Sequence, residues 1–150
     1  MSRNKKISIG RKMMNEGDEK IQESKTLKQK GEKIIREKQR YAEKIENRIA
    51  EGDLITKEGN KLVRIGEKII EEESRPEKDG GARNIIMGKR LQQVGRKRIE
   101  DYKVELEKTE RWINEGEDFI KAGQHIEAEG NMLKKHGKQL VRDTGNNGDH

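Results

Sequence analysis

Three histidines are the side chains of this chain best suited to metal binding or proton transfer. Two of them, His125 and His136, are eleven residues apart, which on one helix places them about 16 Å apart along its axis. One zinc ion cannot be shared across that distance, and His150 stands alone at the end of the sequence. We therefore expect surface histidines, no metal site and no other cofactor.

Acidic residues gather in two short runs, Glu71–Glu73 and Glu115–Asp118. Paired carboxylates catalyse acid–base chemistry when a shaped cleft holds them against a substrate, and the flanking sequence predicts no such cleft. The chain has no cysteine, which excludes thiol chemistry and disulfide bonds. Because no nucleophile–base pair stands out either, the sequence predicts a protein that is not an enzyme and has no small-molecule substrate.

Basic residues form two clusters that indicate a different chemistry. The clusters consist of Arg3, Lys5, Lys6, Arg11 and Lys12, and of Arg96, Lys97 and Arg98. Such clusters bind nucleic-acid phosphates in a salt-dependent, sequence-independent way, and residues 1–40 carry 13 Lys and Arg against 6 acids. A nucleic-acid-associated protein that uses its N-terminal quarter is therefore an alternative function. A membrane partner is not expected, because the apolar stripe is too weak.

The composition limits the elements that can position these residues. Of the 150 residues, 28% are hydrophobic and 43% are charged, and the mean hydropathy is −1.25. An ordinary globular domain is about 45–50% apolar, so a broad core is not expected. The longest apolar run, Ile85–Met87, is too short to span a bilayer. The first residues lack the apolar stretch of a signal peptide, and we expect a cytoplasmic protein.

Glycine carries the strongest pattern in the sequence. All twelve glycines outside residues 80–81 and 145–148 fall on two seven-residue frames, and the second frame is shifted by one residue from the first. The first frame contains Gly10, Gly17, Gly31, Gly52, Gly59 and Gly66, and the second contains Gly88, Gly95, Gly116, Gly123, Gly130 and Gly137. In every heptad, at least one apolar residue follows the frame position by three or four residues.

These spacings predict helices with one apolar stripe that has glycine along its centre, with the 3.5-residue period typical of a left-handed supercoil. Glycine destabilises a helix by ~1 kcal/mol per site relative to alanine, so scattered glycines would break it. Glycines confined to one stripe let a neighbouring backbone approach closely. We therefore interpret the twelve glycines as helix-packing residues.

The segment SRPEKDGG, residues 74–81, combines the only proline with a double glycine and predicts a turn. We expect one all-α domain over residues 1–150: a helix near 5–73, a turn at 74–82, a helix near 83–142 and a frayed tail at 143–150. The fold class is a long antiparallel helical hairpin, coiled-coil-like, with glycine at one heptad position. An alternative has four helices, with breaks near Gly52 and Gly116.

A two-helix hairpin buries only one seam, and two hairpins that pair into a four-helix bundle would cover it more fully. We therefore expect the chain to bind itself as a dimer or a larger homo-oligomer. The leading hypothesis is a non-catalytic structural or interaction protein that self-associates through its glycine-lined helices.

The composition resembles that of hydrophilins and late-embryogenesis desiccation proteins, which are rich in glycine, lysine and glutamate, very hydrophilic and free of cysteine. This resemblance covers the whole chain and implies a stress protectant that is disordered in dilute solution and becomes helical on drying. The seven-residue glycine frame departs from the eleven-residue repeats of such proteins, and it favours a folded assembly.

Overall fold

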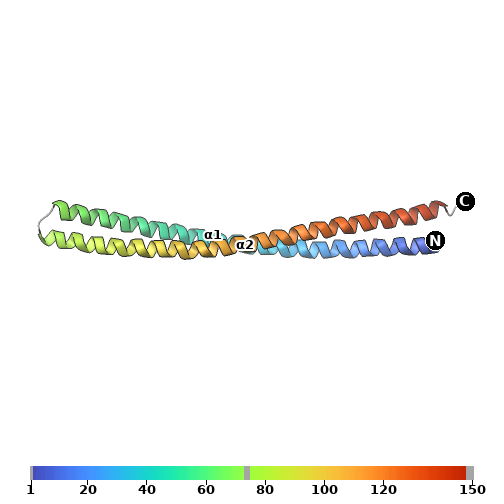
Figure 1. Ribbon diagram of the computed structural model, residues 1–150, viewed down its shortest axis with the longest axis horizontal. Coiled ribbons are helices and arrows are strands. Elements are labelled where there is room, and N and C mark those ends of the chain that lie inside the picture. Colours follow the sequence, from blue (N-terminus) through green and yellow to red (C-terminus); the bar gives the residue numbers. More distant parts are fainter. Residues whose placement is uncertain (1, 73–74, 148–150) are drawn as a thin grey trace. The chain divides into compact units, whose positions relative to one another are not determined.

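The structure, a computed structural model, describes residues 2–72 and 75–147. It contains two α-helices, α1 (Arg3–Glu72) and α2 (Arg75–Asn147), and no strand within the described residues. The two helices pack against each other as a helical hairpin (Figure 1), which confirms the predicted all-α hairpin. Neither helix breaks near Gly52 or Gly116, so the four-helix alternative is wrong.

The chain divides into two units, which are described separately. The terminal unit consists of residues 1–37 and 112–150, and the central unit consists of residues 38–111. In each unit a segment of α1 lies beside a segment of α2, and the two segments run in opposite directions (Figure 1).

One antiparallel register describes the contacts within both units. Gly10 faces Gly137 in the terminal unit and Gly59 faces Gly88 in the central unit, and the two numbers of each pair add to 147. The helix ends Glu72 and Arg75 obey the same rule. We therefore use the word level for a residue of α1 together with the residue of α2 that it faces, whose two numbers add to 147.

Both predicted ends of the second helix need correction. The helix α2 begins at Arg75, whereas a turn was expected through residue 82. Pro76 lies in the first helical turn, where a missing backbone N–H costs nothing, and Gly81 packs against Gly66 although it looked like a turn residue. The positions 73–74 of the predicted turn lie outside the described residues.

At the other end, α2 continues to Asn147, five residues past the predicted limit of 142. Thr144 holds the next position of the glycine frame and is buried, which gives this last segment a packing contact. The helix α1 begins at Arg3 because Ser2 caps it: the Ser2 hydroxyl accepts a hydrogen bond of 3.3 Å from the backbone N–H of Lys5. The last three residues of the predicted frayed tail, 148–150, lie outside the described part of the chain.

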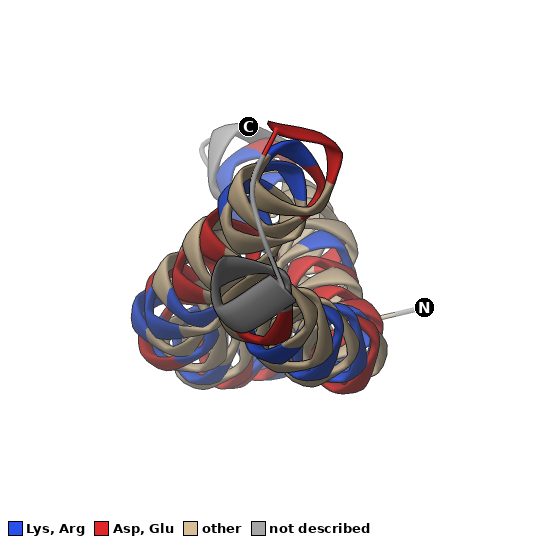
Figure 2. Ribbon diagram, turned by 90° about the vertical axis from the view of Figure 1, so that its left-hand side faces the viewer, with Lys and Arg blue, Asp and Glu red and all other residues tan. Residues whose placement is uncertain are grey.

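Burial follows the heptad along both helices. With the frame position named a and the following positions b to g, position a is mostly buried, positions d and e are mostly half-buried, and the others are mostly exposed. Charged residues of both signs occur along both helices (Figure 2). Ile45, with 3% of its surface exposed, is the one buried hydrophobic residue among the described residues. Most of the apolar surface of the hairpin is therefore only partly covered.

Candidate interaction surface

In the terminal unit, backbone meets backbone along the line of a positions. A Cβ added to Gly10 would lie 2.7 Å from the carbonyl oxygen of Gly137, and one added to Gly17 would lie 2.5 Å from that of Gly130. Real Cβ atoms essentially never approach another heavy atom within 3.0 Å. The missing side chains are therefore what allows the two helices to approach so closely.

The central unit repeats this arrangement over its half nearest to the ends Glu72 and Arg75. A Cβ on Gly59 would lie 2.5 Å from the carbonyl oxygen of Gly88, and one on Gly95 would lie 2.6 Å from that of Gly52. All twelve glycines that the sequence singled out are buried at such contacts. The contact line also includes Gly81 and Thr144, which the sequence analysis placed in the turn and the tail. Both residues continue the second seven-residue frame, Gly81 seven residues before Gly88 and Thr144 seven residues after Gly137, and this spacing could have predicted their burial.

Small hydroxyl residues replace glycine at three levels. Ser24, Thr109 and Thr144 are all buried, and each hydroxyl donates to a carbonyl oxygen of its own helix, at 2.6, 2.8 and 2.8 Å. No buried side-chain nitrogen or oxygen in the described part of the chain lacks a hydrogen-bond partner. Serine and threonine can therefore occupy the line without leaving an unsatisfied polar group.

Larger side chains interrupt the line at two levels of the central unit. By the register, Ile45 faces Tyr102 and Lys38 faces Thr109. Ile45 is buried, Tyr102 is half-buried, and the hydroxyl of Tyr102 accepts a hydrogen bond of 3.1 Å from Arg48. Side chains between the helices require a wider separation than glycine does, so these levels are packed by side chains instead of backbone.

The contact line separates two faces of the hairpin. Because α1 and α2 run in opposite directions, positions d and g of both helices lie on one side of the line and positions b and e on the other. The ion pairs follow this division: Lys20 (d) meets Glu129 (g) at 3.3 Å, and Asp18 (b) meets Lys134 (e) at 2.8 Å. We call the two sides the d/g face and the b/e face.

In the terminal unit, charged side chains bridge the helices on both faces. Lys28 and Glu127 form another ion pair on the b/e face, and the ammonium of Lys30 lies 4.5 Å from the ring centre of Phe119 on the d/g face. In the central unit the ion pairs Lys57–Asp53 and Lys108–Glu105 instead lie within one helix.

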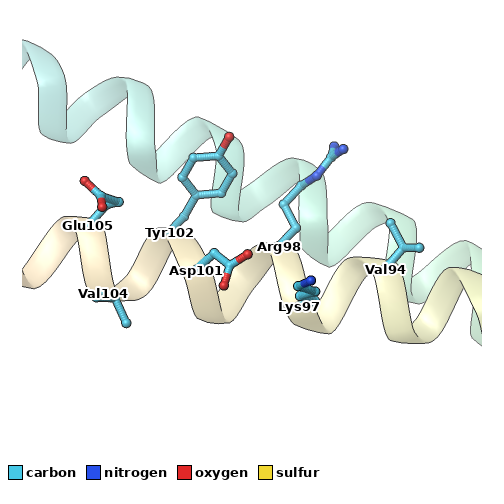
Figure 3. A pocket seen from close by; sticks show the side chains of 7 residues that line it. All are labelled: Val94, Lys97, Arg98, Asp101, Tyr102, Val104 and Glu105. Atoms are coloured by element: carbon cyan, nitrogen blue, oxygen red, sulfur yellow. The ribbon is translucent and has the colours of Figure 1, made fainter.

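The d/g face of the central unit exposes large apolar side chains. Ile65, Met87 and Val94 all stand at position g, and 41%, 58% and 50% of their surfaces are exposed. A depression of about 650 Å³ begins at Val94 and follows α2. It is lined by Val94, Lys97, Arg98, Asp101, Tyr102, Val104 and Glu105, and Figure 3 shows Tyr102 directed toward α1. The sequence did not predict this surface, because the apolar pattern that predicts the hairpin lies at positions d and e.

Two aromatic residues differ from the expected core packing. The four aromatic residues Tyr41, Tyr102, Trp112 and Phe119 lie on or beside the apolar stripe, where core packing is expected, but Tyr41 and Trp112 are exposed. Both stand at position d, on the flank of the contact line, where a large ring extends beyond the cover that the opposite helix provides. Phe119 and Tyr102 are half-buried, as expected for the stripe.

The residues with potential for catalysis or metal binding are spread over exposed surfaces. His125 and His136 are exposed, as are the described acids of the two runs, Glu71, Glu72, Glu115, Glu117 and Asp118. Within the described residues, no group of three or more His, Asp and Glu could hold a metal ion. His150 and Glu73 lie outside the described residues.

The two basic clusters belong to different units. Arg3, Lys5, Lys6, Arg11 and Lys12 lie on α1 in the terminal unit, where Arg11 and Lys12 border a depression of about 530 Å³. Arg96, Lys97 and Arg98 lie on α2 in the central unit and are exposed. Between Asp79 and Glu100, α2 carries six Lys and Arg and no acid.

Comparisons with protein families, with curated proteins and with solved structures found no match to this chain. In the described part of the chain, neither helix has a stretch long and apolar enough to cross a membrane.

Proposed function

We propose that this protein is a non-catalytic structural or interaction protein that self-associates through its glycine-lined helical hairpin. The observation that carries the proposal is the incomplete cover of its apolar residues. Positions d and e are mostly half-buried along both units, and Ile45 is the single buried hydrophobic residue in the described segments. A second hairpin laid on the first would remove this surface from water.

The polar character of the sequence does not conflict with such an assembly. Helical bundles bury only the stripe of each helix that faces the others, and each CH₂ group moved out of water contributes about 0.8 kcal/mol. The glycine contacts hold each hairpin together with little side-chain packing, so the d and e residues stay available for contacts with another copy. The assembly would be a four-helix bundle or a larger helical array.

Sedimentation equilibrium of the full chain over a wide concentration range tests this proposal. Self-association predicts a mass that rises toward twice 17.4 kDa or beyond with increasing concentration, together with a thermal midpoint that rises in parallel. A mass of one chain at every concentration would refute self-association.

Two alternatives predict different results. A nucleic-acid-associated protein would bind duplex DNA with an affinity that falls steeply with salt, through Arg3, Lys5, Lys6, Arg11 and Lys12. A hydrophilin-like protectant would give a coil spectrum in dilute buffer, where the proposed assembly gives a helical one. We favour self-association because incomplete apolar cover extends along both units, whereas the basic clusters are local and acids are interspersed elsewhere on the helices.

A further inference from the structure

We propose that the d/g face of the central unit is the surface that binds a second copy of this chain. This inference rests on the proposed self-association and specifies where it takes place. Three features support it: an apolar centre, two edges of opposite charge, and an opposite face on which several polar groups are paired within one copy.

The apolar centre extends from residue 82 to residue 94 of α2 and includes the residues of α1 that face this segment. Ile65 is level with residue 82 of α2, so it extends the row that Met87 and Val94 form along position g. Leu62 and Leu91 stand at the adjacent d positions and are half-buried beneath them. Together these side chains make an aliphatic surface that crosses from one helix to the other.

Two pairs of exposed side chains of opposite charge stand at matching levels of this face, and we call the pair on α1 its acidic edge and the pair on α2 its basic edge. On α1, Glu51 and Glu58 stand at position g, level with residues 96 and 89 of α2. On α2, Arg90 and Lys97 stand at position c, which lies next to position g at the outer margin of this face, and each is within one residue of those levels. All four side chains are exposed, and none forms an ion pair or hydrogen bond with any other described residue.

A two-fold axis that lies in the face and runs along the helices brings these edges together. The rotation lays α1 of one copy over α2 of the other and keeps each level in place. Glu58 of each copy then meets Arg90 of the other, and Glu51 meets Lys97. Every ion pair occurs twice, and α1 of each copy covers Met87 and Val94 of the other.

The b/e face at the same levels offers less to a partner. Gln92 donates to Asn60 across the contact line at 2.6 Å, Thr56 donates to the carbonyl oxygen of Gly52, and Lys57 pairs with Asp53. These polar groups are satisfied within one copy. Nucleic acid also fits the d/g face less well than a second copy, because Glu51 and Glu58 would repel phosphates.

Two charge reversals test the face directly. The variant Glu51→Lys/Glu58→Lys makes both edges basic, and the variant Arg90→Glu/Lys97→Glu makes both edges acidic. Each should raise the dissociation constant of the assembly by on the order of 100-fold, since every change acts twice in the symmetric pair. An equimolar mixture of the two variants should associate again as a mixed dimer, because each acidic edge then meets a basic one.

The matched control is Lys89→Glu/Arg96→Glu. It makes the same charge change one residue earlier on the same helix, at two exposed b positions of the opposite face. Its sedimentation should equal that of the wild-type chain. Circular dichroism of all three variants shows whether the hairpin itself stays helical.

The outcomes separate the two proposals. Dissociation of both edge variants, recovery in the mixture and an unchanged control support the d/g face. A wild-type chain that stays monomeric overturns self-association and this face together. A wild-type assembly that both edge variants retain, or that the control loses equally, overturns the face and leaves self-association standing. Unchanged assembly of Arg90→Glu/Lys97→Glu with loss of binding to a labelled DNA duplex would instead assign the surface to nucleic acid.

Discussion

The terminal and central units use the same heptad in different ways. In the terminal unit the contact line holds glycine or serine at every level from Gly10 to Gly31, and ion pairs bridge the two helices. In the central unit Lys38, Ile45 and Tyr102 interrupt the line, and the ion pairs Lys57–Asp53 and Lys108–Glu105 lie within one helix.

Exposed apolar residues follow the same division. Among the described residues, the terminal unit exposes Trp112 and Met132, whereas the central unit exposes seven large hydrophobic residues: Tyr41, Leu54, Ile65, Ile86, Met87, Val94 and Val104. The terminal unit thus directs its side chains to the neighbouring helix of the same copy. The central unit leaves more apolar surface exposed.

The largest expected effect comes from filling the contact line. Replacing Gly123 (terminal unit) or Gly59 (central unit) by leucine places a side chain where a Cβ alone would already lie 2.9 or 2.5 Å from a carbonyl oxygen. We expect each to lower the free energy of unfolding by about 3 kcal/mol or more. Thermal melts followed by circular dichroism measure it, and an unchanged midpoint would contradict the close-approach account.

Alanine at two kinds of glycine should have opposite effects. Gly80 is exposed and a Cβ there would meet nothing within 4 Å, so Gly80→Ala should stabilise the helix by about 1 kcal/mol. Gly88→Ala forces a Cβ to within 2.6 Å of the carbonyl oxygen of Gly59 and should destabilise by about 1–2 kcal/mol. Equal effects of the two substitutions would show that helix propensity alone sets the outcome.

Two methionines offer a matched comparison of the units. Met87 and Met132 have similar exposed fractions, 58% and 61%, but only Met87 lies on the d/g face of the central unit. Met87→Ser should weaken self-association about tenfold, corresponding to ~1.4 kcal/mol, while Met132→Ser should leave it unchanged. Sedimentation equilibrium measures both, and a larger effect at Met132 would move the interface to the terminal unit.

The smallest effect is expected at the ion pairs of the terminal unit. Asp18 and Lys134 approach to 2.8 Å across the helices, but the side chain of Asp18 is 62% exposed. An exposed pair of this kind contributes about 0.2–1 kcal/mol, so Asp18→Asn should lower the thermal midpoint slightly in low salt and not at all in high salt. A loss that persists in high salt would indicate a contribution other than charge.

Much of the hairpin was predictable because one period recurs without a break. The frame from Gly10 to Gly66 and the frame from Gly88 to Gly137 each need one continuous helix, and the single proline lies near the connection. The sequence alone does not determine which residue of α1 faces which residue of α2. If one helix is shifted by seven residues along the other, glycine still faces glycine at many levels. The helix ends Glu72 and Arg75 select the register in which the numbers add to 147.

The errors have a common physical cause. Gly81 and Thr144 were placed in a turn and a tail because local propensity favours those states, whereas a buried contact with the other helix outweighs it. The exposed Ile65, Met87 and Val94 stand at position g, outside the stripe that holds a single hairpin together. Folding of one copy does not require apolar residues there, so a search for the hairpin core passes over them.

The most direct test of this account is sedimentation equilibrium of the two charge-reversed variants, Glu51→Lys/Glu58→Lys and Arg90→Glu/Lys97→Glu, alone and mixed. The central unit's d/g face predicts that each variant alone is monomeric at concentrations where the wild-type chain is dimeric, and that the equimolar mixture is dimeric again. A mixture that stays monomeric while both variants remain helical would contradict it.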